Sequence, residues 1–490
     1  MTNRRFTYRN HLFFFIFLFI YALLAFINLT TLPVAWTDEV MNLDPAIQFQ
    51  KFGHYFSKLW PNPGAERVFA SYPPLIQMWH ILWLKFAEPT IFNIRLPFLV
   101  FHLSTLCILY YLLHELLKNK YLPLLLTILF AFDKSVFELS RSVRIEVIIM
   151  LLISLFYLIQ TKSNNPFLLG FISGLLLIAH LYTLPIVMAW LVKTGLKNSF
   201  KYNLKFSLSL FLPLLLSLWI INFNVTEIIS QLGLQAAKHT PQSNGLFFVL
   251  RDSFYSRFFP YYNEQPLMWV VYISILVFIV YSIYKQRNSI KYALLQGTLL
   301  ELTMLGITIF GAMSAQYRYL PAFLLIGIIT FANEKLQPNK YLIGIFTVIV
   351  INGFISFSAR HATAIYQRNE RNPEPILTFL NQNIPQNKKT LILGESIGEY
   401  YSATHKLCDY GLDFHPVHFK FSDYENVYFL SKDSIQYSRC KRISTYKPIQ
   451  NKIPSIMAKF AKGGTYSNTI LWKVESEIEF NRINQPHLTY

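Results

Sequence analysis

The sequence predicts an all-α polytopic membrane bundle of about 11 transmembrane helices, with interfacial helices in its first outer loop and a C-terminal soluble α/β domain. Three observations support this fold class. The 490 residues are 53% hydrophobic and only 14% charged, whereas soluble domains carry nearer a quarter charged residues. The apolar residues form long blocks up to about residue 358. From Arg360 onward no apolar run is long enough to span a bilayer. We therefore predict a membrane domain at 1–358 and a soluble domain at 359–490.

The first apolar run, Leu12–Leu32, has 21 residues without a charge, which suits one membrane crossing. Three arginines precede it, which places the N-terminus in the cytoplasm. The run lacks a small-residue cleavage site, so we expect an uncleaved span. The loop that begins at Thr37 then lies outside. Within it, residues 40–58 suit an interfacial helix and Leu75–Phe86 suits a second interfacial or re-entrant helix, separated by the helix-breaking Pro73-Pro74.

Ten further crossings follow, and lysines or arginines mark their internal turns. They are Ile94–Leu113, Tyr121–Phe132, Val147–Ile159, Phe167–Tyr182, Thr183–Val192, Phe206–Phe223, Pro266–Tyr284, Tyr292–Ala312, Leu320–Ala332 and Tyr341–Phe357. An odd number of crossings puts the C-terminal domain on the side opposite the N-terminus. This predicts a multi-pass protein of the cell (inner) membrane with an extracytoplasmic C-terminal domain.

The C-terminal region has the composition of a soluble mixed domain. Pro373–Asn383 suits a helix, and Thr390–Leu393 and Asn426–Leu430 suit short strands. Cys408 and Cys440 are equally consistent with a disulfide and with two free thiols.

Polar residues collect at the predicted outer ends of the spans in three places. These are Asp38-Glu39, the segment Asp133–Glu146, and Arg318 between two tyrosines. Carboxylates close to lipid are costly and tend to mark function. An arginine fork suits a phosphate group, and a carboxylate can take the proton from an attacking hydroxyl. These residue types together suit transfer from a phosphate-linked donor.

The order of these motifs resembles a known family. Thr37-Asp38-Glu39 is followed by Tyr72-Pro73-Pro74-Leu75, Arg95-Leu96-Pro97, Arg141-Ser142-Val143-Arg144-Ile145-Glu146 and Arg318-Tyr319-Leu320-Pro321. Over residues 10–360 the chain is similar to integral-membrane glycosyltransferases of the GT-C superfamily, in the branch of protein O-mannosyltransferases and aminoarabinose transferases. The resemblance implies a polyprenyl-phosphate-linked sugar donor and action on the non-cytoplasmic face.

The resemblance also implies roles for residues. Asp38 matches the family's key carboxylate and is the expected general base of an inverting transfer, with Glu39 assisting it or holding it by charge. A second acidic residue is expected at Asp133 or Glu138. The expected donor-phosphate ligands are Arg144 and Arg318, then Arg141. Donor or acceptor contacts are expected from Tyr72 and from the outer loop Asn224–Gln265, at Arg257, Tyr261 and Tyr262.

The expected partners are the lipid-linked donor, the bilayer, and a glycan, lipid or protein acceptor. Nucleic acid is not expected, because the net charge of +18 is spread between the apolar runs. No metal ligand set is predicted, and the sequence leaves the cofactor question open, because the resemblance is compatible with a divalent metal ion and with none.

Other interpretations of the same residues exist. Asp38 suits an N-cap of an interfacial helix, and Arg141 and Arg144 suit salt bridges with Glu138 and Glu146. Arg318 suits a side chain that reaches lipid headgroups. At the level of the whole chain, the alternatives are a transporter or flippase for a lipid-linked or anionic substrate, and a membrane-anchored binding protein.

Two further patterns are weaker. Gly394-Glu395-Ser396-Ile397-Gly398 fits a nucleophile elbow, with Asp409, Asp413, His415 and His418 after it, but a glycine turn between a strand and a helix explains it better. His405, Cys408, Asp409, His415 and His418 match no strong zinc spacing. His180 is expected to form a hydrogen bond within the bundle.

Overall fold

The structure, a computed structural model, describes most of the chain between residues 2 and 480. The segments that it does not describe are 1, 35–36, 60–66, 240–263, 286–297, 310–316, 334–339, 406, 412–419, 432–439, 449–465, 467–468, 479 and 481–490.

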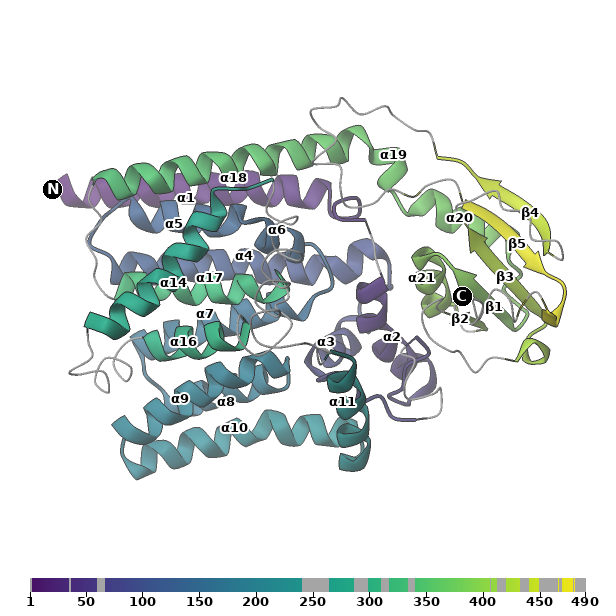
Figure 1. The fold of residues 1–490 in the computed structure, drawn as a ribbon, viewed down its shortest axis with the longest axis horizontal. Coiled ribbons are helices and arrows are strands. Elements are labelled where there is room, and N and C mark those ends of the chain that lie inside the picture. The colour runs from purple at the N-terminus through teal and green to yellow at the C-terminus, as the bar shows by residue number, and fades with distance from the viewer. Residues whose placement is uncertain are drawn as a thin grey trace.

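Long helices that run roughly side by side form the body of the molecule, and a small sheet lies at one end of them (Figure 1). The helices of the body are α1 (Thr2–Ile27), α4 (Ile91–Leu116), α5 (Leu122–Phe132), α7 (Ile145–Lys162), α8 (Pro166–Leu177), α9 (Leu184–Lys197), α10 (Phe200–Ile220), α14 (Met268–Lys285), α16 (Leu299–Ile307), α17 (Leu320–Asn333) and α18 (Lys340–Tyr366). Each predicted crossing overlaps one of these helices, which confirms the helical membrane bundle.

Five described helices are long and apolar enough to cross a membrane: α4, α7, α10, α14 and the segment Ile343–Tyr366 of α18. Four apolar helical segments are shorter: His11–Ile27, Leu122–Phe132, Pro166–Leu177 and Leu320–Asn333. Because α9 and the described part of α16 belong to neither group, the number of 11 crossings stays a prediction.

Shorter helices gather at the end of the bundle that faces the sheet, which we call the sheet end (Figure 1). They are α2 (Thr37–Phe52), α3 (Leu75–Trp83), α6 (Lys134–Leu139), α11 (Val225–His239) and the 3₁₀ turns η1 (Leu181–Thr183) and η4 (Tyr317–Tyr319). Helices α2 and α3 confirm the two helices predicted in the first long loop. The bundle therefore carries its polar, irregular material at one end.

The C-terminal domain is a five-stranded sheet with helices beside it. Helix α18 runs through the predicted boundary at residue 358 and leads, by way of α19 (Arg368–Arg371), into this domain. Its elements are α20 (Glu374–Asn383), β1 (Thr390–Gly394), α21 (Ser396–Thr404), β2 (Cys408–Gly411), η5 (Phe421–Asp423), β3 (Asn426–Ser431), β4 (Cys440–Tyr446) and β5 (Thr469–Val474). The strand order is β2-β1-β3-β5-β4, with β1 parallel to β2 and β3, and β5 antiparallel to β3 and β4.

Alternate residues of β1 face opposite sides of the sheet, as the period of a strand requires. Leu391 and Leu393 pack with Phe429 and Trp472 in a small core of the domain. Ile392 belongs instead to the large apolar cluster that is continuous with the bundle. One face of the sheet is thus part of the main core, so the domain is packed onto the rest of the protein.

Polar contacts fix the domain to the first long loop. The Lys58 ammonium lies 2.9 Å from Asp409, and Lys51 donates to the carbonyl of Ala403 at 2.8 Å. Both lysines belong to the segment that begins with α2. Helix α21 packs against α2, so the domain covers the loop that carries Asp38.

The two cysteines of the domain are not joined in a disulfide. Cys408 lies in β2 and Cys440 in β4, and these strands are the opposite edges of the sheet. This settles the alternative that the sequence left open, against a disulfide between Cys408 and Cys440.

Gly394 has a φ of +104° at the turn from β1 to α21. A Cβ there would lie 2.1 Å from the carbonyl oxygen of Leu430. The glycine is therefore required by the backbone, which agrees with the turn interpretation of the Gly-x-Ser-x-Gly pattern. Asp409 contacts Lys58 and Tyr424, and the other candidate partners of Ser396 (Asp413, His415 and His418) lie outside the described residues.

Candidate active site

Asp38 lies at the start of α2 and is held by two arginines. Its Oδ2 atom is 2.8 Å from Nη1 of Arg144 and 2.8 Å from Nη1 of Arg318. Arg144 is the residue before α7, and Arg318 is in η4. Within the described residues, Oδ1 of Asp38 accepts no hydrogen bond, and the side chain is 32% exposed. One carboxylate oxygen is thus fixed by two cations, and the other accepts no hydrogen bond from the described residues.

Glu146 holds Arg144 from the side opposite Asp38. Nε of Arg144 donates to Oε2 of Glu146 at 3.1 Å, and Nη2 donates to Oε1 at 2.8 Å. Glu146 is buried, in the first turn of α7. We call Asp38, Arg144, Glu146 and Arg318 the Asp38 cluster. Its two carboxylates and two guanidinium groups balance in charge.

Phenol and imidazole groups lie beside this cluster. Nδ1 of His180 accepts from the backbone N–H of Tyr182 at 3.2 Å. Since Nδ1 is an acceptor, the neutral ring carries its proton on Nε2, which lies 2.7 Å from the Tyr72 hydroxyl. Burial, followed by Tyr319 and Glu146, raises the pKa of Tyr72 well above its ordinary value. The phenol therefore stays protonated at neutral pH, and His180 is hydrogen-bonded as predicted.

Tyr182 and Tyr319 lie beside His180, and we call these two residues the tyrosine wall. Their ring centroids are 4.1 Å apart. The centroid of the Tyr319 ring also lies 5.5 Å from that of the His180 ring. Both tyrosines are at least nine-tenths buried. The Tyr182 hydroxyl has no hydrogen-bond partner among the described residues. The predicted Tyr72 and Arg318 are therefore brought together with Asp38, and the tyrosine wall is an addition to the predicted set.

Glu39 lies apart from the cluster, although it is adjacent to Asp38 in the chain. Its carboxylate forms two hydrogen bonds with Arg95, at 2.9 Å to Nε and 2.5 Å to Nη2. It also accepts from the backbone N–H of Val143 at 2.9 Å. Both charged side chains are buried. Glu39 therefore joins α2 to α4 as half of a buried ion pair, and its placement does not support the predicted assistance to Asp38.

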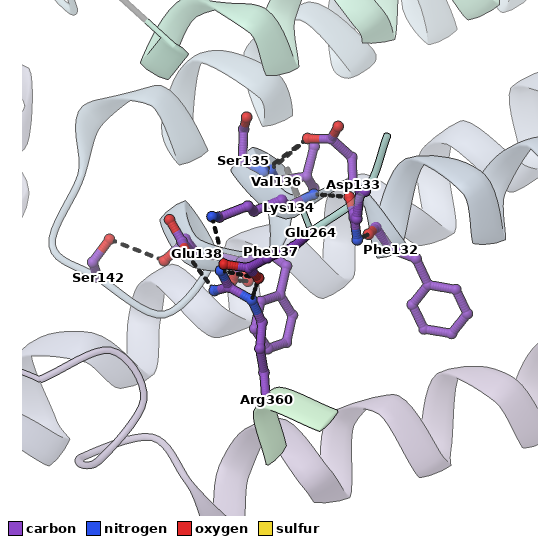
Figure 2. Close-up of polar contacts among 12 residues, drawn as sticks. Phe132, Asp133, Lys134, Ser135, Val136, Phe137, Glu138, Ser142, Glu264 and Arg360 are labelled. Atoms are coloured by element: carbon purple, nitrogen blue, oxygen red, sulfur yellow. Dashed lines mark hydrogen bonds and ion pairs between the residues drawn. The ribbon is translucent and has the colours of Figure 1, made fainter. Parts of the chain in front are cut away.

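Asp133 is the N-cap of α6. Its Oδ1 accepts from the backbone N–H groups of Ser135 and Val136, at 2.9 and 3.1 Å, and its Oδ2 accepts from the Tyr272 hydroxyl at 3.1 Å. Figure 2 shows the capping bonds. Satisfying free N–H groups at a helix start is a structural role. The side chain is fully buried, so its contacts do not support the predicted role as a second catalytic acid.

Glu138 belongs to a second charged network, drawn in Figure 2. It pairs with Arg360 of α18. Arg360 also contacts Glu264 at 2.7 Å, and Glu264 pairs with Lys134 at 3.0 Å. This network ties α6 to α18 and to the segment before α14. The carboxylate of the segment 133–146 that lies in the Asp38 cluster is instead Glu146.

Arg141 is buried beneath the surface, not at the cluster. Nη2 lies 2.8 Å from Nε2 of His361, and the guanidinium is 4.0 Å from the centroid of the Phe137 ring. Burial lowers the pKa of Arg141 to about 9, which leaves it charged at neutral pH. Among the described residues, its Nε and Nη1 atoms have no hydrogen-bond partner. Its placement does not support direct contact with a donor phosphate in this conformation.

The remaining predicted loop residues, Arg257, Tyr261 and Tyr262, lie outside the described residues. Within the part of the chain that the structure describes, no group of three or more histidines, cysteines, aspartates and glutamates is arranged to hold a metal ion.

Sequence reasoning did not single out Glu146, Tyr182 and Tyr319 as site residues, and it gave His180 only a structural role. It assigns Glu146 to a structural salt bridge and places His180 inside a span. The available signal was their position: Glu146 lies two residues after Arg144 at the start of an apolar run, and His180 directly precedes the turn Leu181–Thr183 between two apolar helices.

No family model matches the chain, and no curated protein sequence matches it. Solved structures do match. The crystal structure of ArnT from Cupriavidus metallidurans in the apo state aligns over 93% of this chain and 97% of that chain, with a TM-score of 0.57 at 9% identity. The chain shares its fold with ArnT.

The second ArnT structure, bound to undecaprenyl phosphate, aligns over 94% of this chain and 98% of that chain, with a TM-score of 0.54 at 9% identity. The likeness to ArnT covers both the bundle and the C-terminal domain. The fold that the resemblance implied is thereby confirmed, because the chain has the fold of ArnT in both parts.

Proposed function

We propose that this chain is a membrane glycosyltransferase that moves a sugar from a polyprenyl-phosphate donor to an acceptor hydroxyl. The observation that carries the proposal is Asp38, whose Oδ2 is held by Arg144 and Arg318 while its side chain stays partly exposed. A positioned carboxylate beside arginines suits proton removal from a hydroxyl next to a phosphate. The ArnT structure that contains undecaprenyl phosphate supports a lipid-linked donor for this fold.

The proposed reaction is a single displacement. Oδ1 of Asp38 takes the proton of the acceptor hydroxyl, whose oxygen forms a bond to the anomeric carbon of the sugar. The bond between that carbon and the phosphate oxygen breaks, and its electron pair stays on the phosphate. Polyprenyl phosphate leaves with its added negative charge facing the arginines, and the configuration at the anomeric carbon is inverted.

We further propose that the sheet end lies on the non-cytoplasmic side of the cell (inner) membrane. The arginines in the N-terminal part of α1 and the lysines at α9 and α10 lie at the opposite ends of these helices from the Asp38 cluster, and cytoplasmic loops carry an excess of such residues. The lipid tail of the donor would then lie among the apolar helices, and its phosphate would meet the cluster. The sugar is a hexose or a pentose, and the acceptor is a glycan, a lipid or a protein.

The Asp38→Asn variant tests the proposal. The purified protein in lipid nanodiscs is given a panel of polyprenyl-phosphate sugars together with membrane extract as the source of acceptor. Free polyprenyl phosphate is then measured. The wild type is expected to release it, and Asp38→Asn is expected to lose about a thousandfold or more of that rate, because the base is gone. A variant with wild-type release and wild-type thermal stability would refute the role of Asp38.

The flippase alternative makes a different prediction in the same preparation. It requires a labelled polyprenyl-phosphate sugar to change leaflet in sealed vesicles while the sugar stays attached to the lipid. Movement without release would replace the glycosyltransferase proposal with that alternative. The described charged groups favour transfer, because the Asp38 cluster lies at one end of the bundle, whereas transporter sites lie near the bilayer midplane.

A further inference from the structure

Arg144 has every donor nitrogen committed to a carboxylate. Nε and Nη2 form a bidentate pair with Glu146, and Nη1 contacts Oδ2 of Asp38. Its side chain is 4% exposed, and that of Glu146 is 1% exposed. Two parallel charge-assisted hydrogen bonds in a buried setting fix both position and orientation. Arg144 therefore cannot turn toward a ligand without breaking the pair with Glu146.

Arg318 is placed differently on the same oxygen of Asp38. Its Nη1 makes the same 2.8 Å contact, but its side chain is 23% exposed, several times more than that of Arg144. It belongs to the short turn η4 that leads into α17, whereas Arg144 directly precedes the long helix α7. The two arginines thus share one partner atom on Asp38 but differ in how far their side chains are exposed.

We propose that Glu146 is a positioning residue that divides the work of the two arginines. It keeps Arg144 on Asp38 throughout the reaction, and it leaves Arg318 as the arginine that passes from Asp38 to the phosphate of the donor. This inference rests on the proposed function.

The charges of the reaction fit this division. A donor phosphodiester carries one negative charge, and the departing polyprenyl phosphate carries two when it leaves unprotonated. The acceptor proton goes to Asp38, which becomes neutral in the step that adds charge to the phosphate, so the total charge of the site is unchanged. Asp38 then needs fewer cations, and the phosphate needs more. Arg318 therefore moves from Asp38 to the phosphate. The positive charge of Arg144 stays paired with the Glu146 carboxylate, and Arg144 keeps Asp38 in position.

The test separates lipid binding from turnover. Undecaprenyl phosphate is the binding probe, titrated into the purified full-length protein in nanodiscs without any acceptor. Donor KM and kcat are then measured by release of polyprenyl phosphate. The variants are Glu146→Gln, Glu146→Asp and Arg318→Ala. The control is Glu115→Gln, which removes an exposed ion pair with Lys162 at the other end of the bundle.

Arg318→Ala is expected to weaken binding of undecaprenyl phosphate about tenfold or more and to raise the donor KM. Glu146→Gln is expected to leave that binding within about twofold of the wild type, or to tighten it, while kcat falls about tenfold or more. Glu146→Asp keeps the charge and should recover part of kcat. If Glu146→Gln does not fold, Glu146→Asp replaces it in the test. Glu146→Asp is then expected to bind undecaprenyl phosphate like the wild type and to have a lower kcat.

The inference is overturned if Glu146→Gln, or a folded Glu146→Asp, weakens lipid binding as much as Arg318→Ala, or if its kcat equals that of the wild type. It is also overturned if Arg318→Ala binds the lipid normally. The proposed function fails separately: wild-type protein that neither binds undecaprenyl phosphate nor releases it from any donor would refute both, whereas normal wild-type activity with the wrong variant pattern would refute the inference alone.

Discussion

Asp38 and Glu39 are chain neighbours with unrelated surroundings. Successive residues of an α-helix point in directions about 100° apart, so the first turn of α2 directs one carboxylate to the arginines of the cluster and the other to Arg95. Asp38 is partly exposed, whereas Glu39 and Arg95 are buried. The exposed carboxylate suits proton transfer, and the buried one suits the joining of two helices.

The Glu39→Ala variant is expected to lose about 3–5 kcal/mol of stability, because it leaves the Arg95 charge buried without its partner. Thermal unfolding in detergent measures the loss. Asp38→Asn serves as the matched carboxylate change and should unfold within about 1 kcal/mol of the wild type, since that side chain is partly solvated. A Glu39→Ala protein as stable as the wild type would contradict the structural role.

Helices α8 and α10 approach each other closely through two glycines that are one turn apart. A Cβ on Gly170 would lie 2.0 Å from the carbonyl oxygen of Phe206, and one on Gly174 would lie 2.3 Å from that of Leu210. Small residues at such spacing let helix backbones pack tightly in membranes, where association depends on close contact. The pair lies in the same helix hairpin that leads to His180, so its packing sets the position of one wall of the site.

Gly170→Ala is therefore expected to destabilise the protein by about 1–3 kcal/mol, because the added methyl group forces the helices apart. Gly195→Ala in α9 is the control, since nothing lies within 4 Å of a Cβ there. That control is expected to be neutral or to gain up to about 1 kcal/mol from helix propensity. The measurement is the midpoint of thermal unfolding of both variants. Equal midpoints for Gly170→Ala and Gly195→Ala would show that the α8–α10 contact is not tight.

At the scale of the whole molecule, the C-terminal domain is held over the loop that carries the proposed base. The apolar side of this contact belongs to the main core, and the polar side includes the ion pair of Lys58 and Asp409, whose side chains are 15% and 19% exposed. A domain fixed to α2 limits the motion of the chain segment that begins with Asp38.

Reversing one charge of that pair should loosen the domain. Lys58→Glu and Asp409→Lys are each expected to cost about 1 kcal/mol or more and to raise hydrogen exchange in α21, because like charges then face each other. The double variant should recover part of the loss, but not all, since Asp409 also accepts from Tyr424. Lys162→Glu, in the exposed pair with Glu115, is the control. No recovery in the double variant would show that the two side chains act separately.

The sequence by itself determined the membrane bundle, the helices of the first long loop, the mixed C-terminal domain and the candidate base. These follow from local properties: apolar run length, proline and glycine positions, and carboxylates beside lipid-facing segments. The order of the motifs also predicted that Arg144 and Arg318 serve the same site as Asp38.

The tertiary structure decided which charges meet. Glu39, Asp133, Glu138 and Glu146 are similar acids in similar polar segments, and the sequence favoured the first three as catalytic. The first three have partners that are far away in the chain, at Arg95, Tyr272 and Arg360. Glu146 pairs with Arg144, two residues before it, and reaches the Asp38 cluster through the contact of that arginine with Asp38. Burial and pairing depend on how helices pack side by side, and local residue patterns do not encode that packing.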